Sequence, residues 1–357
     1  MLEERYDVVI VGSGPAGAAA AQAMRGHGRS SVMIERDKLP RYKMCSGIVF
    51  PRARRLVADD FGPLPNDVLA EPASFHGNRL FFNLEDPAIT VPFSVFDDDP
   101  DLDEEALNVK RSEFDHWLSR QSEIPIVDGC RFSELRRDGD DLVLELSRDG
   151  DEVEVRTRYL VGADGTKSAV RGELSQSFEE GVRFIPNYEE WYTGSIDLAP
   201  GWFYQFFDRT ITGFFATVVH KDGHIIVVTG SRQEEPVRDY FQRFVAHLKE
   251  RHGLVIDASV RQSGCGVHDM AATGNYFLGE GNVLLAGEAG GFNRCAEGIT
   301  SALVTGRAAG ESVVQAFDSG GSALAAYSEA VAPEIEACGK VYQGIEAALG
   351  FNPFQRD

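Results

Sequence analysis

The sequence of 357 residues lacks several features that would each indicate a class of protein. Its five cysteines form no C-x-x-C pair and no metal-ligand spacing, so we expect free thiols, an intracellular chain and no metal site. No apolar run approaches the roughly 18 residues of a membrane span. The chain enters a strand almost at once, so we expect no signal peptide.

Positive charge is also scarce. There are 35 Lys and Arg residues against 56 Asp and Glu, a net charge of −21. This balance disfavours nucleic acid as a partner and gives no electrostatic attraction to anionic lipid. We therefore expect a cytoplasmic protein, either free or at the membrane periphery, whose partner is a small molecule. The acidic stretch at residues 97–105 is expected to be a solvated loop.

A nucleotide-binding pattern opens the chain. An apolar strand at residues 6–11 leads into GSGPAG, an alanine-rich helix follows to about Gly28, and a second strand ends at Glu35. The six residues match G-x-G-x-x-G at the strand-to-helix position that such a motif needs. The predicted cofactor contacts here are Gly12, Gly14, Pro15, Ala16, Gly17, Glu35 and Arg36.

Each residue type in this pattern has a physical reason. Gly12 allows a tight turn, Gly14 lets the backbone approach a pyrophosphate, and Gly17 lets the helix lie close to the sheet. The helix N-terminus attracts the phosphates. Glu35, 18 residues after Gly17, is placed to bond a ribose hydroxyl, which favours FAD or NAD over NADP. The motif alone leaves the choice between FAD and NAD open.

Two later segments narrow that choice. RTRYLVGADGTKSAVR carries Asp164 and Gly165 at the end of a strand. GNVLLAGEAGGFNRCAEGITSALVTG carries Gly287 and Glu288 after another strand, before a helix from about Gly298. The order of the three motifs resembles that of the flavoprotein hydroxylase superfamily with the p-hydroxybenzoate hydroxylase-like fold, over residues 6–311.

This resemblance implies FAD as the cofactor and assigns roles to particular residues: the predicted cofactor contacts from these later motifs are Asp164, Gly287, Glu288, Gly298 and Ile299. In that superfamily the late acid, here Glu288 in place of the usual Asp, bonds the ribityl chain of FAD. The helix beginning at Gly298 and Ile299 then points its N-terminus at the pyrimidine end of the flavin. Arg111 in VKRSEFDHWL matches a family arginine that contacts the flavin or its phosphates, and the alternative is an ordinary surface arginine.

The chain has no second G-x-G-x-x-G, so we expect one firmly held dinucleotide. Electrons would come from NAD(P)H that binds transiently or from a donor protein. The expected fold class is α/β: a Rossmann-like FAD-binding domain with a β-meander, interleaved with an antiparallel-sheet substrate domain. The predicted FAD-binding segments are 1–74, 102–182 and 262–318, the substrate segments are 75–101 and 183–261, and a C-terminal helix occupies 319–357.

Residues 201–208 form a strand that is aromatic on both faces. One face should pack in the core and the other should roof the flavin, and the sequence leaves open which does which. We assign Trp202, Tyr204 and Phe206 to the substrate pocket, together with Phe215 and Cys295. Tyr204 is also a candidate catalytic residue.

The segment RYKMCSGIVFPRA resembles one branch of the superfamily, the geranylgeranyl reductases, including the digeranylgeranylglycerophospholipid reductases. They carry K-x-C-x-G before PRA, and here Lys43, Cys45 and Gly47 match. Their YxWxFP motif has only a loose counterpart in GWFYQFFD. The resemblance implies hydride transfer from reduced flavin N5 to a carbon–carbon double bond of an isoprenoid or other apolar substrate, with an acid protonating the second carbon.

Cys45 is the candidate acid in this scheme, and Cys45, Ser46 and Gly47 are expected near the flavin. The alternative is that Cys45 is a small buried residue. We also consider a redox pair between Cys45 and Cys295. Two other functions stay open: an FAD monooxygenase of an aromatic or polyketide-like substrate, and a flavin-binding electron-transfer protein without its own substrate.

Overall fold

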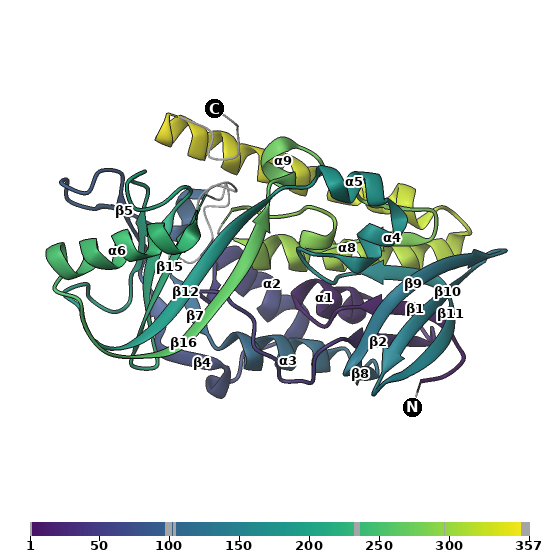
Figure 1. The fold of residues 1–357 in the computed structure, drawn as a ribbon. Helices are drawn as coiled ribbons and strands as arrows, with labels where there is room; N and C mark the ends of the chain where they lie inside the picture. The colour runs from purple at the N-terminus through teal and green to yellow at the C-terminus, as the bar shows by residue number, and fades with distance from the viewer. Residues whose placement is uncertain (1, 97–101, 103–104, 232–235, 296, 351–357) are drawn as a thin grey trace.

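The computed structural model describes residues 2–96, 102, 105–231, 236–295 and 297–350, so most of the acidic stretch 97–105 lies outside it. Two large sheets lie side by side, and the long strands β12 and β16 reach from one toward the other (Figure 1). The fold is mixed α/β, which confirms the predicted fold class. Within these ranges no helix combines the length and the apolar character that crossing a membrane requires.

The first sheet carries the nucleotide motif at its centre. In the part of the chain that the structure describes, its strands follow the order β17-β18-β11-β1-β2-β8, with β10 paired to β11 and β9 paired to β10. The pairs β1·β11, β1·β2, β2·β8 and β11·β18 are parallel, whereas β9, β10 and β11 form an antiparallel meander. The strands are β1 (Arg5–Val11), β2 (Ser31–Glu35), β8 (Ile126–Asp128), β9 (Cys130–Asp138), β10 (Asp141–Arg148), β11 (Asp151–Gly162), β17 (Gly279–Glu280) and β18 (Val283–Leu285).

The second sheet is almost entirely antiparallel. Within the described residues its strands follow the order β16-β12-β15-β14-β13-β5-β6, and of their pairings only β13·β5 is parallel. The strands are β5 (Asn78–Phe81), β6 (Ile89–Val91), β12 (Phe184–Ser195), β13 (Phe203–Phe206), β14 (Ala216–Lys221), β15 (His224–Gly230) and β16 (Val255–His268). The domain boundary expected at residues 261 and 262 falls inside β16, and the division into domains stays a prediction.

A small third sheet and the helices complete the fold. The sheet joins β3 (Ile48–Val49), β7 (Ala106–Val109) and β4 (Leu69–Phe75). Helix α9 runs along one edge of the molecule, past both large sheets (Figure 1). The helices are α1 (Pro15–Met24), α2 (Pro51–Phe61), α3 (Arg111–Gln121), α4 (Ala169–Leu174), α5 (Gln176–Gly181), α6 (Val237–Arg251), α7 (Met270–Thr273), α8 (Gly298–Ser319) and α9 (Ala323–Leu349), with 3-10 turns η1 (Asn66–Val68), η2 (Phe93–Phe96) and η3 (Gly287–Ala289).

Small residues let α1 and α8 approach each other closely. A Cβ at Gly306 would lie 2.1 Å from the carbonyl oxygen of Ala16, and one at Gly310 would lie 2.4 Å from that of Ala20. Only glycine fits these two positions without a shift of the backbone. This contact places the start of α8, from the third motif, beside the helix of the first.

Most local predictions are confirmed. The β-meander is present and turns at Asp138-Gly139 and Asp149-Gly150, and the hairpin between β14 and β15 turns at Asp222 and Gly223, both with positive φ. Two lengths differ. Helix α1 ends at Met24 rather than near Gly28, because Gly26 and Gly28 both adopt positive φ. Strand β13 covers Phe203–Phe206 instead of the whole of residues 201–208.

Candidate flavin site and adjoining cavity

The turn between β1 and α1 has the shape that a bound pyrophosphate needs. Gly12 has φ +105°, and a Cβ on it would lie 2.4 Å from Ala163 O. A Cβ on Gly17 would lie 1.9 Å from Gly12 O. Gly14 differs, because among the described residues its Cβ would meet only Arg41 Nη2, at 3.5 Å. The space beside Gly14 is therefore open, and the N-terminus of α1 faces it.

Glu35 ends β2 as a buried carboxylate. Its Oε2 accepts hydrogen bonds from Ser13 N at 3.2 Å, from Ser13 Oγ at 2.7 Å and from Arg41 Nε at 3.0 Å. Burial alone would raise the pKa of Glu35, but Arg41 and Ser13 hold it below its ordinary value. Arg36, assigned to the cofactor from sequence, is exposed and contacts Asp37. Arg41 is the arginine that lies beside Glu35 and Gly14.

Arg111 is buried at the first turn of α3, which excludes the surface-arginine alternative. Its Nε and Nη2 donate to Asp115 at 3.0 and 2.9 Å, and Arg41 Nη1 lies 3.4 Å from the same carboxylate. Burial disfavours the Arg111 cation, yet Asp115 and Cys45 raise its pKa above the ordinary value. Two permanent cations thus lie near the dinucleotide turn.

Glu288 joins three segments that are distant in sequence. Its Oε2 accepts from Thr166 Oγ1 at 2.7 Å, its Oε1 accepts from Asn293 Nδ2 at 3.0 Å, and Lys43 Nζ lies 3.7 Å away. Burial would raise the pKa of Glu288, but Lys43 leads the groups that hold it below the ordinary value. The second motif, the third motif and the cysteine loop therefore meet at one ionised carboxylate.

The remaining motif residues surround this carboxylate or support it. A Cβ on Gly298, the first residue of α8, would lie 4.0 Å from Glu288 Oε1, while Ile299 is buried in the core. Gly287 packs against Ala16. Asp164 has a structural task that was not predicted: its carboxylate accepts from Ser168 Oγ and from two backbone N–H groups at the start of α4.

Lys221 supports the cysteine loop and was missed in the sequence analysis. Its Nζ donates to Ser46 O and Val109 O, each at 2.7 Å, and the side chain is almost wholly buried. Gly47 has φ +70° and has no room for a Cβ, which would lie 2.3 Å from this amine. Gly47 N donates to Cys45 Sγ at 3.4 Å. No local pattern marks Lys221, because its acceptors come from two remote segments.

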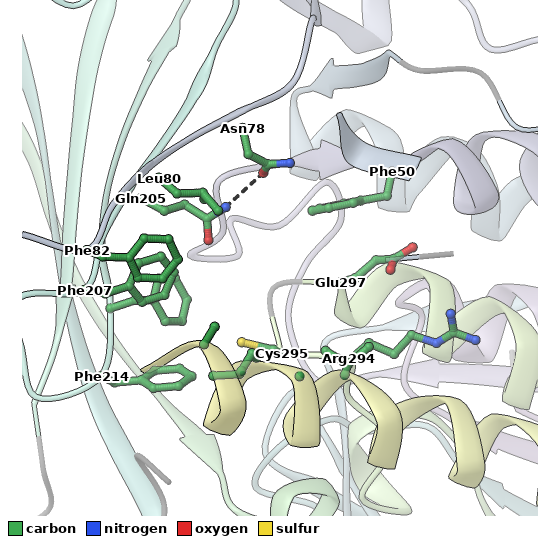
Figure 2. Close-up of a pocket in the computed structure, with 15 residues that line it drawn as sticks. Phe50, Asn78, Leu80, Phe82, Gln205, Phe207, Phe214, Arg294, Cys295 and Glu297 are labelled. Carbon is green, nitrogen blue, oxygen red and sulfur yellow. Dashed lines mark hydrogen bonds between the residues drawn. The ribbon is translucent and has the colours of Figure 1, made fainter. Parts of the chain in front are cut away.

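An apolar cavity lies between the second sheet, the loop before α8 and helix α9 (Figure 2). Its empty volume, including its opening to solvent, is about 790 Å³. Phenylalanine rings dominate its wall, and the side chains that line it are Phe50, Asn78, Leu80, Phe82, Gln205, Phe207, Phe214, Phe215, Arg294, Cys295, Glu297, Val341, Ile345 and Ala348, with Gly344. The largely apolar lining suits an apolar ligand.

The two faces of β13 have different surroundings. Of the residues that the sequence assigned to the substrate pocket, Phe215 and Cys295 line this cavity, whereas Trp202, Tyr204 and Phe206 do not. These three belong to the core cluster that the sheet forms with α6, and Tyr204 donates its hydroxyl hydrogen to Ala199 O at 3.0 Å. The opposite face of β13 contributes Gln205 to the cavity, with Phe207 just beyond the strand.

Charged groups stand at the α8 end of the cavity. Glu297 directly precedes α8 and accepts from Thr300 Oγ1 at 2.5 Å. Arg294 forms a buried, bidentate pair with Glu334 on α9, at 2.8 and 2.6 Å. The five cysteines, all within the described residues, form no disulfide. Cys295 lines the cavity while Cys45 contacts Arg111, and the idea that the two act as a redox pair stays a prediction.

Comparison with known proteins identifies the family. A family model described as an FAD binding domain matches residues 5–289. The chain belongs to this FAD-binding family of oxidoreductases. Protein CbrA of Shigella sonnei is 29% identical over 314 residues, which covers 84% of this chain and 82% of that protein.

Two solved structures show the same fold as this chain. A geranylgeranyl bacteriochlorophyll reductase-like protein from Thermoplasma acidophilum superposes with a TM-score of 0.71 at 17% identity, covering 98% of this chain and 84% of that one. The p-nitrophenol 4-monooxygenase of Pseudomonas putida gives 0.74 at 17% identity, covering 99% and 91%. At such identities the likeness concerns the fold and leaves the reaction undetermined.

FAD is the cofactor of this family, and the residues present fit it. The open face of Gly14 and the N-terminus of α1 suit the pyrophosphate, with Arg41 beside them. Glu35 lies at the end of β2, where the motif predicts the adenosine ribose. Glu288 is ionised and close to Gly298, which suits a hydroxyl of the ribityl chain. These individual contacts, and those of Cys45, Ser46 and Gly47, are proposals from the geometry.

Lys221 gives the first testable prediction. Burial lowers its pKa to about 8, whereas an unfolded lysine titrates near ~10.4. Between these values the folded amine is neutral while the unfolded one is charged, so the unfolded state binds more protons and stability rises with pH. Relative to Lys221→Met, the wild-type free energy of unfolding should increase by about 1.4 kcal/mol per pH unit from roughly pH 8 to 10.

The measurement is urea unfolding of both proteins at several pH values. A neutral amine keeps two N–H groups for Ser46 O and Val109 O, so the loop should stay in place throughout. Lys340→Met, at a lysine whose side chain is 61% exposed, provides the baseline. A difference between wild type and Lys221→Met that does not vary with pH would contradict the assignment.

Proposed function

We propose that this protein is an FAD-dependent reductase of a carbon–carbon double bond in an apolar, isoprenoid-type substrate. The observation that carries the proposal is the cavity, whose wall is largely hydrocarbon and which ends at Glu297, beside the first residue of α8. An elongated apolar chain could lie between the phenylalanine rings and α9 with one end near the flavin site. The K-x-C-x-G loop adds support, because it contacts Arg111 and Glu288.

The chemistry requires two hydrogens on adjacent carbons. Bound FAD, once reduced, supplies a hydride, which carries both electrons to one alkene carbon. The chain must exclude water, hold the alkene in position and deliver a proton to the other carbon. Among the described residues that line the cavity, the Cys295 thiol and, in its protonated form, the Glu297 carboxyl can give a proton that solvent later replaces.

The candidates from sequence fit this step less well. Tyr204 donates to Ala199 O in the core, away from the cavity. Cys45 contacts Arg111 and is not among the cavity-lining side chains. We therefore propose that Cys45 shapes the cofactor side of the loop and does not act as the acid.

A monooxygenase acting on an aromatic compound is the second candidate. The cavity favours it in one respect, because several phenylalanine rings offer flat surfaces to a planar substrate. The two functions differ in their need for oxygen. A reductase consumes reduced flavin anaerobically when an alkene is added, whereas a monooxygenase needs oxygen and leaves an oxygenated product.

The deciding experiment uses the purified holoenzyme, reduced under anaerobic conditions. Geraniol, farnesol and simple phenols are then added separately, and the return of oxidised-flavin absorbance is followed with product analysis. Reoxidation by a prenyl compound, with loss of one double bond, supports the proposal. Reoxidation only after oxygen is admitted, with a hydroxylated phenol as product, supports the monooxygenase.

The proton donor can be separated from the rest of the site. Glu297→Gln should retain FAD but slow anaerobic reoxidation by alkene roughly 100-fold, since a positioned acid contributes about 10²–10⁴. Cys295→Ala should change the rate only a few-fold if Glu297 is the donor. The reverse pattern would transfer the role to Cys295, and near wild-type rates in both variants would exclude both side chains.

A further inference from the structure

The cavity wall is interrupted on the sheet side by two buried amides, Asn78 on β5 and Gln205 on β13. Asn78 is fully buried and Gln205 is 8% exposed, yet both line the cavity. They lie on adjacent strands, where the parallel pairing sets Phe203 opposite Asn78 and Gln205 opposite Leu80. Polar side chains in so apolar a wall call for a reason beyond packing.

The hydrogen bonds fix how both amides are turned. Asn78 Nδ2 donates to Val91 O at 3.5 Å, so Asn78 Oδ1 faces β13. Gln205 Nε2 donates to that oxygen at 2.9 Å. Rotating the Gln205 amide would bring two carbonyl oxygens together, so its nitrogen must face Asn78 and its Oε1 must face away.

Gln205 Oε1 therefore presents a hydrogen-bond acceptor to the cavity. Figure 2 shows this oxygen turned away from Asn78, toward the space that Phe82 and Cys295 also border. Within the described part of the chain it has no hydrogen-bond partner, although Gln205 Nε2 is bonded. An acceptor in a largely apolar wall favours a ligand that brings a donor to the same place.

We propose that Gln205, held by Asn78, binds a hydroxyl group of the ligand, so that the preferred substrate is an apolar compound with a free alcohol or phenol O–H. This inference rests on the proposed function only in placing the substrate in this cavity. An amide oxygen accepts but cannot donate, so an ether of the same shape loses this hydrogen bond. Gln205 Oε1 therefore selects a ligand by whether it carries a hydroxyl group.

The test compares ligand pairs that differ only in the hydroxyl hydrogen. Farnesol is paired with farnesyl methyl ether, and 4-butylphenol with 4-butylanisole. Binding to the oxidised holoenzyme is followed by the change in flavin absorbance or fluorescence, so turnover is not required. We expect at least one alcohol to bind about tenfold more tightly than its ether. The pair that shows this preference tells whether the hydroxyl of the ligand belongs to a prenyl alcohol or to a phenol.

Gln205→Leu should abolish this preference by weakening alcohol binding while leaving ether binding nearly unchanged. Phe82→Leu, on the same wall, is the matched control: it should weaken both ligands of a pair alike and keep their ratio. If Gln205→Leu loses FAD, Asn78→Leu replaces it, because release of the Gln205 amide should reduce the ratio toward unity.

Equal affinity for alcohol and ether in both pairs, or a preference that survives Gln205→Leu, would overturn the inference. So would failure of all four compounds to bind. These outcomes are separate from those of the proposed reductase activity. A preference for the alcohol without anaerobic alkene reduction would contradict the proposed reductase activity and support the hydroxyl subsite. Alkene reduction without that preference would support the reductase activity and contradict the subsite.

Discussion

Gly14→Ala is expected to give a folded protein that no longer retains FAD. Gly14 has φ −74° and ψ −176°, a backbone conformation that alanine adopts without strain. The new Cβ would touch only Arg41 Nη2, at 3.5 Å, so the fold can accept it. The methyl group would occupy the open space in which the backbone approaches the pyrophosphate. We expect FAD affinity to fall at least about tenfold, which is about 1.4 kcal/mol.

Bound flavin is measured by visible absorbance per protein after gel filtration, and affinity is measured by titrating the apoprotein with FAD. Gly17→Ala provides a contrast, because its Cβ would lie 1.9 Å from Gly12 O and should disrupt the turn and lower stability as well. Gly172→Ala is the control, since a Cβ there meets nothing within 4 Å. Wild-type FAD affinity in Gly14→Ala would refute this account of the turn.

Glu334→Leu is expected to lower the free energy of unfolding by about 3–5 kcal/mol. The Arg294–Glu334 pair is almost completely buried, with side chains 2% and 1% exposed. Glu334 also accepts a hydrogen bond from Ser301 Oγ at 2.7 Å. Its loss leaves a buried guanidinium that cannot shed its charge, because arginine stays protonated at any ordinary pH. The midpoint of thermal unfolding should fall by on the order of 5–10 °C.

The double variant Arg294→Met with Glu334→Leu should recover much of the loss, because it removes both charges from the interior. Glu311→Gln is the matched control: its ion pair with Arg307 is exposed, and its removal should change stability by less than about 0.5 kcal/mol. Thermal unfolding of all three variants checks the prediction. Equal stability of Glu334→Leu and Glu311→Gln would show that the buried pair contributes little.

The pair also explains why the cavity depends on α9. Arg294 belongs to the loop before α8, and Glu334 is separated from it by 40 residues. The bidentate contact holds α9 against this loop, while Val341, Ile345 and Ala348 on the same helix form part of the cavity wall. A weakened pair should therefore loosen the wall as well as the core.

The sequence by itself determined the features that depend on neighbours along the chain. The turn at Gly12 and Gly14 follows from a strand, a tight glycine turn and a small-residue helix within about 20 residues. The β14–β15 hairpin follows from Asp222 and Gly223, because both central positions require positive φ. The order of three such local motifs was enough to predict the flavoprotein fold and FAD.

Tertiary structure alone decided what lies between those motifs. Both faces of residues 201–208 are aromatic, so alternation predicts a strand but not which face α6 covers. Trp202, Tyr204 and Phe206, which the sequence assigned to the substrate pocket, pack in the core with α6 and are not among the cavity-lining residues. The Asn78–Gln205 pair joins residues 127 apart. Lys221 is bonded to segments 175 and 112 residues away. Burial and hydrogen-bond partners at such separations depend on how the sheets pack, and no local pattern of residue types carries that information.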